Sequence, residues 1–295
     1  MLIRDTWEGI ISMTDSKTKL SELQLFFGEP LEYNGIKMYQ PTIGDILEYD
    51  KKYGESEFWR VLNVFIGNPT MYRLMLWDLG IDWNKISDFE LFATLVKNLE
   101  QKTTEILLGD LDFTKFEIYT KQSPPVLEIN EETGEETVSV PEPTIVLYKP
   151  VLLDEETETE LEPEIEIDEN TYNMMALYYR TIFNIFPKVE KAKGKTTKKW
   201  IIEEDRMNYN LHKNEETTST LLPLISSCLN HSGFKYKKKE LKNVGIYEFM
   251  DSVQRLQIYE QSTALLKGAY SGFMDSSKIP SEQFNFMREI THDKK

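Results

Sequence analysis

The spacing of apolar positions predicts helices over most of the chain and strands in its middle. Residues 55–99 carry apolar side chains three or four positions apart, with breaks at 67–69 and at 80, so three short helices are expected there. The clearest helical stripe is Ile246, Phe249, Val253 and Leu256. Between 113 and 150 the pattern changes to short runs of β-branched and aromatic residues, which favours strands. Other expected helices cover 42–53, 168–186, 198–212 and 221–229, and a last short helix begins at Ser281.

Short motifs predict where several elements begin or turn. Asn34-Gly35 lies between alternating apolar flanks, and this dipeptide tolerates the positive φ angles of a tight hairpin turn. Thr42 is expected to cap the next helix, with Asp45 in its first turn. Asp88 and Thr220 are predicted as the caps of two later helices.

The middle of the chain predicts β-hairpins. Residues 131–134 are expected to form the loop between the strands VLEI (126–129) and TVSV (137–140). A second hairpin is expected to pair residues 151–153 with 164–167, where Glu and Ile alternate. A disordered acidic linker is the alternative. We therefore expect an α+β, mostly α-helical fold: a helical domain with an N-terminal hairpin at 1–112, a central acidic β-hairpin-rich insertion at 113–169, and a helical domain at 170–295.

The charge of the chain is concentrated in that middle segment. The 295 residues carry a formal charge of −16, and residues 121–170 contain sixteen acids and two lysines, which leaves only −2 for the rest. The chain also contains two basic runs, with six lysines in 188–199 and five in 235–242. These runs are free to bind an acidic partner, either the acidic segment itself or that of another copy, so a homo-oligomer is one expectation.

The basic runs raise the question of nucleic-acid binding. Lys195, Lys198, Lys237 and Lys238 lie near Trp200 and Tyr236, and such a combination can grip phosphates and stack on bases. The net negative charge opposes it, and a solvated surface is the simpler interpretation. Nucleic-acid binding is therefore kept as a second alternative function.

Candidate chemical sites are few. His212, His231 and His292 lack the spacing of a metal site, and the lone Cys228, among apolar neighbours, is predicted to be buried. Gly194-Lys195-Thr196 resembles the end of a phosphate-binding loop, but Val189 replaces its first glycine. We predict no catalytic residue, no metal and no cofactor. No apolar run is long enough to cross a membrane and no signal peptide is apparent, so a cytoplasmic location is expected.

Several stretches resemble proteins encoded among the tail genes of bacteriophages and prophages of Gram-positive bacteria. They lie within residues 167–208 and 219–279, and the hairpin-and-helix segment PLEYNGIKMYQPTIGDILEYD (30–50) is similar in style. The most characteristic are FPKVEKAKGKTTKKWIIEED (186–205), TLLPLISSCLNHSGFKY (220–236) and FMDSVQRLQIYEQSTALLKGAYSGFMD (249–275).

The resemblance implies a phage tail morphogenesis protein, with a tail assembly chaperone as the first expectation. Such proteins are non-enzymatic and bind the tape-measure protein in the host cytoplasm until tail-tube subunits polymerise around it. A structural component of the virion, in the tail or baseplate, is the alternative. The apolar stripe at Ile246, Phe249, Val253 and Leu256 is the expected partner surface, together with Lys195, Lys198, Lys237 and Lys238. Packing of the stripe in the core is the competing interpretation, and the one that we favour.

Overall fold

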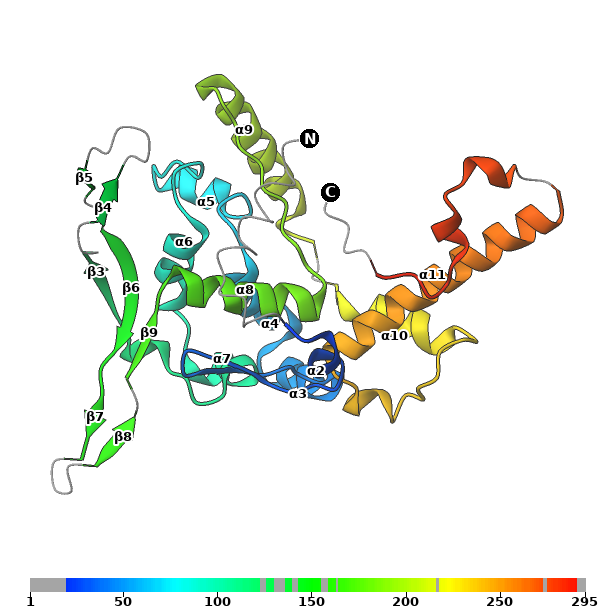
Figure 1. Cartoon of the computed structure of the whole chain (residues 1–295), viewed down its shortest axis with the longest axis horizontal. Coiled ribbons are helices and arrows are strands. Elements are labelled where there is room, and N and C mark those ends of the chain that lie inside the picture. Colours follow the sequence, from blue (N-terminus) through cyan, green and yellow to red (C-terminus); the bar gives the residue numbers. More distant parts are fainter. Residues whose placement is uncertain are drawn as a thin grey trace.

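Helices make up most of the structure, and most of the small antiparallel sheets lie on one side (Figure 1). The computed structural model describes residues 20–122, 126–129, 136–139, 143–154, 159–162, 164–215, 218–272 and 275–290. The predicted α+β, mostly helical class is confirmed. The helices are α2 (Glu22–Phe26), α3 (Ile43–Tyr53), α4 (Glu55–Ile66), α5 (Arg73–Asp78), α6 (Asp88–Val96), α7 (Gln101–Leu108), α8 (Glu169–Phe183), α9 (Lys195–His212), α10 (Leu221–Asn230) and α11 (Ile246–Tyr270).

Helix α8 runs through the middle of the molecule and is buried along most of its length (Figure 1). It packs against α4, α6 and the start of α11. Tyr172, Met175, Tyr179 and Phe183 from α8 join one hydrophobic core with residues of the N-terminal helices. Residues from both of the helical parts that we predicted, 1–112 and 170–295, thus contribute to one hydrophobic core.

Arg180 of α8 ties three helices together inside this core. Its buried guanidinium donates hydrogen bonds to the backbone oxygens of Ile66 and Gly67, at 2.8 and 3.1 Å, and to the Asp88 carboxylate at 3.1 Å. The last carbonyls of a helix have no partner within the helix, so Arg180 satisfies the end of α4 while pairing with the first turn of α6. Glycine is required where α4 ends, because a Cβ at position 67 would lie 2.4 Å from the Asn63 backbone oxygen and 2.8 Å from the Tyr72 ring.

Local sequence signals correctly predicted the hairpin at residues 31–38 and the start of helix α3. Strands β1 (Leu31–Tyr33) and β2 (Ile36–Met38) form the hairpin, and Asn34 and Gly35 have φ angles of 48° and 76°. Thr42 caps α3, and the Asp45 carboxylate accepts a hydrogen bond from the Thr42 N–H in return, which completes a capping box.

One predicted cap is wrong, and another has its predicted position but makes no side-chain hydrogen bond. Ser87, not Asp88, caps α6, and Asp88 instead occupies the first helical position, where it is available to Arg180. The hydroxyl of Thr220 makes no capping hydrogen bond. The carboxylate of Glu55, from the start of α4, accepts hydrogen bonds from the Thr220 and Leu221 N–H groups at 2.7 and 3.2 Å. A side chain 165 positions away in sequence thus binds two N–H groups at the start of α10, and the Ser219 hydroxyl accepts a third hydrogen bond, from the Leu222 N–H at 2.9 Å.

Strand β6 (Thr144–Lys149) is the centre of a three-stranded antiparallel sheet. It pairs with β3 (Glu117–Lys121) on one side and β9 (Ile165–Ile167) on the other. Beyond the two ends of this sheet lie the pairs β4 (Val126–Ile129) with β5 (Glu136–Ser139), and β7 (Leu152–Leu153) with β8 (Glu160–Glu162) (Figure 1). The pairing of 126–129 with the next predicted strand is confirmed, while the loop at 131–134 lies outside the described residues.

The predicted pairing of residues 151–153 with 164–167 is wrong. Residues 152–153 pair with 160–162, and Ile165–Ile167 pairs with β6. Burial explains the register, because Ile165 and Ile167 join Leu147 in the main core while Leu152 and Leu153 are exposed. Pro150 separates β6 from β7 in the sequence and Pro163 separates β8 from β9, and a proline has no N–H for the ladder.

We call the hydrogen bonds of Arg180 to Ile66, Gly67 and Asp88 the Arg180 clamp, and its removal should destabilise the fold. We expect Arg180→Met to lower the free energy of unfolding by about 3 kcal/mol, because it leaves the Ile66 and Gly67 carbonyls and the Asp88 carboxylate without their donor. Arg60→Met is the matched control: Arg60 pairs with Glu57 on the surface, and its loss should cost under about 0.5 kcal/mol. Urea denaturation measures both, and equal values would contradict the clamp.

Glu162 should titrate unusually low. The ammonium groups of Lys115 and Lys149 bond its carboxylate and lower its pKa to about 2. A lowered pKa means that the pairing stabilises the fold above the unfolded pKa of roughly 4.3, and that this stability is lost as the pH falls toward 2. A carboxyl carbon-13 titration measures it. Lys115→Met should raise the pKa, whereas Lys121→Met should not, since Lys121 bonds Glu166 instead.

Candidate protein-binding surface

Helix α9 projects from the helical core (Figure 1), and several of its apolar side chains are exposed to solvent. Trp200, Met207 and Leu211 are 70%, 64% and 65% exposed. They are seven and four positions apart, close to two turns and one turn of helix, so they share one face. We call these three residues the α9 stripe. Large apolar side chains aligned on an exposed helix face are typical of a protein interaction site.

The opposite face of α9 is anchored to the rest of the molecule. Ile202, its buried residue, joins Leu76 and Trp83 in a second, smaller hydrophobic cluster. Lys198 bonds the Asp82 carboxylate at 2.6 Å and lies 5.5 Å from the centre of the Trp83 ring. This ammonium lowers the pKa of Asp82 through their hydrogen bond. The anchored face leaves the α9 stripe directed away from α5.

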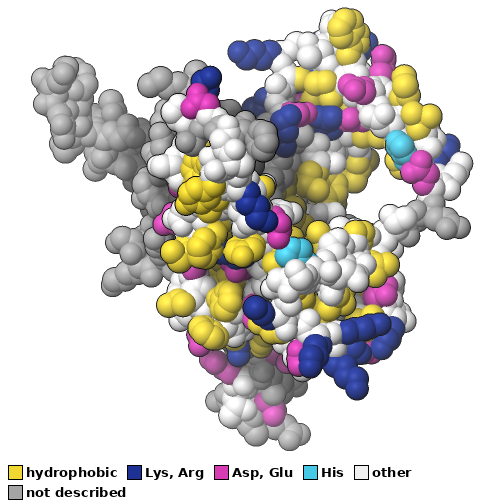
Figure 2. Space-filling view, turned by 90° about the vertical axis from the view of Figure 1, so that its right-hand side faces the viewer, with side chains coloured by type: hydrophobic (Ala, Val, Ile, Leu, Met, Phe, Trp, Pro, Cys, Tyr) yellow, Lys and Arg dark blue, Asp and Glu magenta, His cyan; other side chains and the backbone are white. Residues whose placement is uncertain are grey.

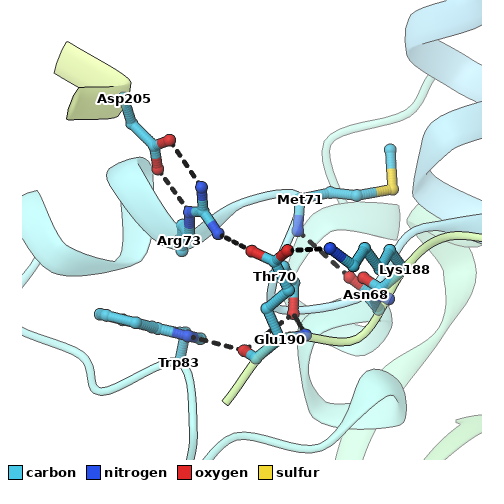
Figure 3. A network of polar contacts seen from close by, with 8 residues as sticks. All are labelled: Asn68, Thr70, Met71, Arg73, Trp83, Lys188, Glu190 and Asp205. Atoms are coloured by element: carbon cyan, nitrogen blue, oxygen red, sulfur yellow. Dashed lines mark hydrogen bonds and ion pairs between the residues drawn. The ribbon is translucent and has the colours of Figure 1, made fainter. Parts of the chain in front are cut away.

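Arg73 of α5 is the centre of the polar contacts beneath α9 (Figure 3). Its guanidinium makes two hydrogen bonds to the Asp205 carboxylate, at 2.5 and 2.7 Å, and a third to Glu190 at 2.6 Å. The hydrogen bond to Asp205 is the largest of the effects that raise the pKa of Arg73. Lys188 and Arg73, in that order, lower the pKa of Glu190. The Arg73–Asp205 pair joins α5 directly to α9, and the Arg73–Glu190 pair joins α5 to the segment before α9.

The connection between α8 and α9 is fastened along its length. Asn68 donates to the backbone oxygens of Pro187 and Lys188, and Asn84 donates to that of Ala192 at 2.7 Å. The hydroxyl of Thr70 accepts from the Glu190 N–H at 3.0 Å, while the Trp83 indole donates to the Glu190 oxygen (Figure 3). Helix α9 begins at Lys195, three residues before the predicted start at about Lys198.

The α9 stripe has an acidic border. Glu203 and Glu204 lie between Trp200 and Met207 in sequence, and both are exposed. Neither makes an ion pair with any residue that the structure describes. An apolar face bordered by free carboxylates suits a helix that carries apolar residues flanked by Lys or Arg.

The structure places the predicted partner stripe mostly in the core. Ile246 and Phe249 are fully buried, and Val253 and Leu256 are partly buried against the same core. The first two therefore cannot serve as an exposed contact, and their role is core packing. The physical reason is that α11 begins beside α2 and α8 and extends away from the core only further along (Figure 1).

The four predicted lysines fall into different settings. Lys198 is an internal anchor of α9, as described above. Lys195 is exposed at the first position of α9. Lys237 and Lys238 are exposed in the loop before α11. The structure thus does not assemble these lysines into one site, although Figure 2 shows basic side chains gathered low on the face of the molecule that it presents.

The remaining candidate residues lie apart from α9's outer face. Cys228 is buried as predicted, and burial raises the pKa of its thiol. His212 and His231 each contact one glutamate, Glu215 and Glu260, and His292 lies outside the described residues. In the part of the chain that the structure covers, no group of three or more potential ligands is arranged around a metal position. None of the described helices is both long and apolar enough to cross a bilayer.

The anchoring of α9 is open to a direct test. We expect Arg73→Gln to speed hydrogen exchange in α9 roughly tenfold or more, because several charge-assisted hydrogen bonds are lost from a mostly buried guanidinium. Arg206→Gln is the matched control. Arg206 of α9 also pairs with a carboxylate of α5, Asp78, but both side chains are half exposed, so this pair should contribute little. Peptide-resolved deuterium uptake measures both. Unchanged exchange in Arg73→Gln would show that the ion pairs do not hold the helix.

Comparison with protein-family models, curated proteins and solved structures returned no match.

Proposed function

We propose that this chain is a bacteriophage tail morphogenesis protein of the assembly chaperone type, non-enzymatic, that holds a helical segment of the tape-measure protein on the α9 stripe. The observation that carries the proposal is the pairing of an anchored face and an apolar exposed face on one helix. Ion pairs fix the inner face, while Trp200, Met207 and Leu211 remain uncovered. The helix is thus already ordered before a partner arrives, which reduces the entropic cost of binding.

A helical client fits this surface in shape and in charge. An amphipathic helix buries its apolar side chains against an apolar helix face, with anchors three, four and seven positions apart. Trp200 is the natural central anchor, because tryptophan is enriched among the residues that dominate binding energy. Glu203 and Glu204 would favour clients with basic residues beside the apolar face. We place this activity in the host cytoplasm, where the tape-measure protein is made.

Removal of apolar side chains from the α9 stripe should weaken binding of the client and leave the fold intact. We expect Trp200→Ser with Met207→Ser to weaken binding to the tape-measure protein of the same phage at least tenfold, since two exposed apolar anchors are removed. Co-expression followed by affinity purification gives the first readout, and titration calorimetry with the captured segment gives the dissociation constant. Circular dichroism should be unchanged, because both side chains are exposed.

The matched control is Leu222→Ser, which removes a 61% exposed leucine from α10 and should leave binding unchanged. Replacing Glu203 and Glu204 by lysine should weaken binding and reduce its dependence on salt. Equal binding by the stripe variant and the control would contradict the proposal, and so would a tape-measure protein that is not captured by the unaltered chain.

A structural virion component is the second candidate, and the strands β3–β9 favour it. In the sequence they form a central acidic insertion, and the paired strands reach beyond the helical body at both ends of the sheet (Figure 1). Such projecting pairs suit contacts between neighbouring subunits of an assembly. Mass spectrometry of purified particles separates the two candidates, because a chaperone is absent from the mature virion and a structural component is present.

A further inference from the structure

Strand β3 forms an open edge of the three-stranded sheet. It pairs with β6 along all five residues, Glu117–Lys121, and no described residue pairs with its other side. The helical body lies on the β9 side of the sheet, so the β3 edge faces outward (Figure 1). All five residues are exposed, and Ile118 and Tyr119 are each 47% exposed. An exposed edge strand with apolar side chains is a template for another strand.

The sequence of β3 is complementary to itself when read in the opposite direction. In an antiparallel pair centred on Tyr119, Glu117 lies opposite Lys121 of the second copy, and Ile118 lies opposite Thr120. Directly opposite residues share a face, so both charged pairs form attractive contacts. Parallel pairing in register would instead place like charges together. Charge therefore selects one register and one direction.

We propose that β3 is a self-association edge: two copies of the chain join their β3 strands antiparallel about a twofold axis at Tyr119, which makes one continuous six-stranded sheet. The interface is isologous, with each copy contributing the same residues, as a closed dimer requires. It goes beyond the client-binding function of α9, because it uses a different element and a different partner.

Both faces of the sheet accommodate the second strand. On the outer face, Tyr119 already packs edge-on against Tyr148, and the second Tyr119 would extend this aromatic row. On the helical side, Ile118 borders an open hollow of about 470 Å³ that is also lined by Ile86, Ala93 and Ile145. The incoming Ile118 and Thr120 would occupy the space beside this hollow.

The two charged residues are available for the pairing. Glu117 makes no ion pair with any described residue. Lys121 bonds the Glu166 carboxylate at 2.6 Å, but it remains more than half exposed and its ammonium has further donors. A five-residue strand pair is a small interface, so we expect dissociation constants on the order of micromolar.

A charge exchange tests the register. Four proteins share the change Glu166→Gln, which removes the internal partner of Lys121: this background, Glu117→Lys, Lys121→Glu, and the combined exchange. Each single reversal should weaken dimerisation roughly tenfold or more, since it replaces two attractive pairs by two repulsive ones. The combined exchange should restore the dimer to within about threefold of the background. Sedimentation equilibrium from about 1 to 300 μM measures all four.

Cross-linking tests the twofold axis. A cysteine replacing Tyr119 would face its own copy with Cα atoms about 5 Å apart, within disulfide range. Thr120→Cys is the control, because its two copies would be about 8 Å apart. The proposal expects a disulfide dimer from Tyr119→Cys well above the control level. A monomeric background, single reversals without effect, a combined exchange that fails to restore the dimer, or equal cross-linking of the two cysteines would each overturn it.

Discussion

The guanidinium of Arg180 is the interaction on which the helical arrangement depends. It is buried at the point where α4 ends and α6 begins, and it is bonded to the backbone of one and to a carboxylate of the other. A buried cation is tolerated only when its donors are satisfied, so α4, α6 and α8 must meet in one geometry. Because α8 is also the element that joins the N-terminal and C-terminal helices, this clamp fixes the shared core.

Two parts of the molecule project from that core, and each is fixed by different physics. The sheet is attached through Leu147, Ile165 and Ile167, which the hydrophobic effect holds in the main core. Helix α9 is attached largely through charge, with Arg73 and Lys198 pairing to carboxylates beside a small apolar cluster. The α9 stripe and the β3 edge therefore lie on two separate elements, and each element is attached to the core.

Local signals predicted much of the fold. The Asn34-Gly35 turn and the Thr42 cap were confirmed because their hydrogen bonds involve residues only a few positions apart. Helix α7 was missed, and its Thr103 and Thr104 weaken the apolar pattern, although both are buried and bond their own helix backbone. The pairing of 151–153 was wrong because alternation in Glu164–Ile167 shows one buried face but not which strand lies beside it.

The sequence by itself determined the mostly helical class, the position of most strands, the concentration of acid at 121–170 and the burial of Cys228. These follow from periodicity and composition, which any single chain carries. Tertiary structure alone decided that the stripe beginning at Ile246 is core while Trp200, Met207 and Leu211 are exposed. Regularly spaced apolar residues on a helix predict that it has an apolar face, but not which element, if any, packs against that face. Only the packing of α11 against α2 and α8, and of the opposite face of α9 against α5, assigns one face to the interior and the other to solvent.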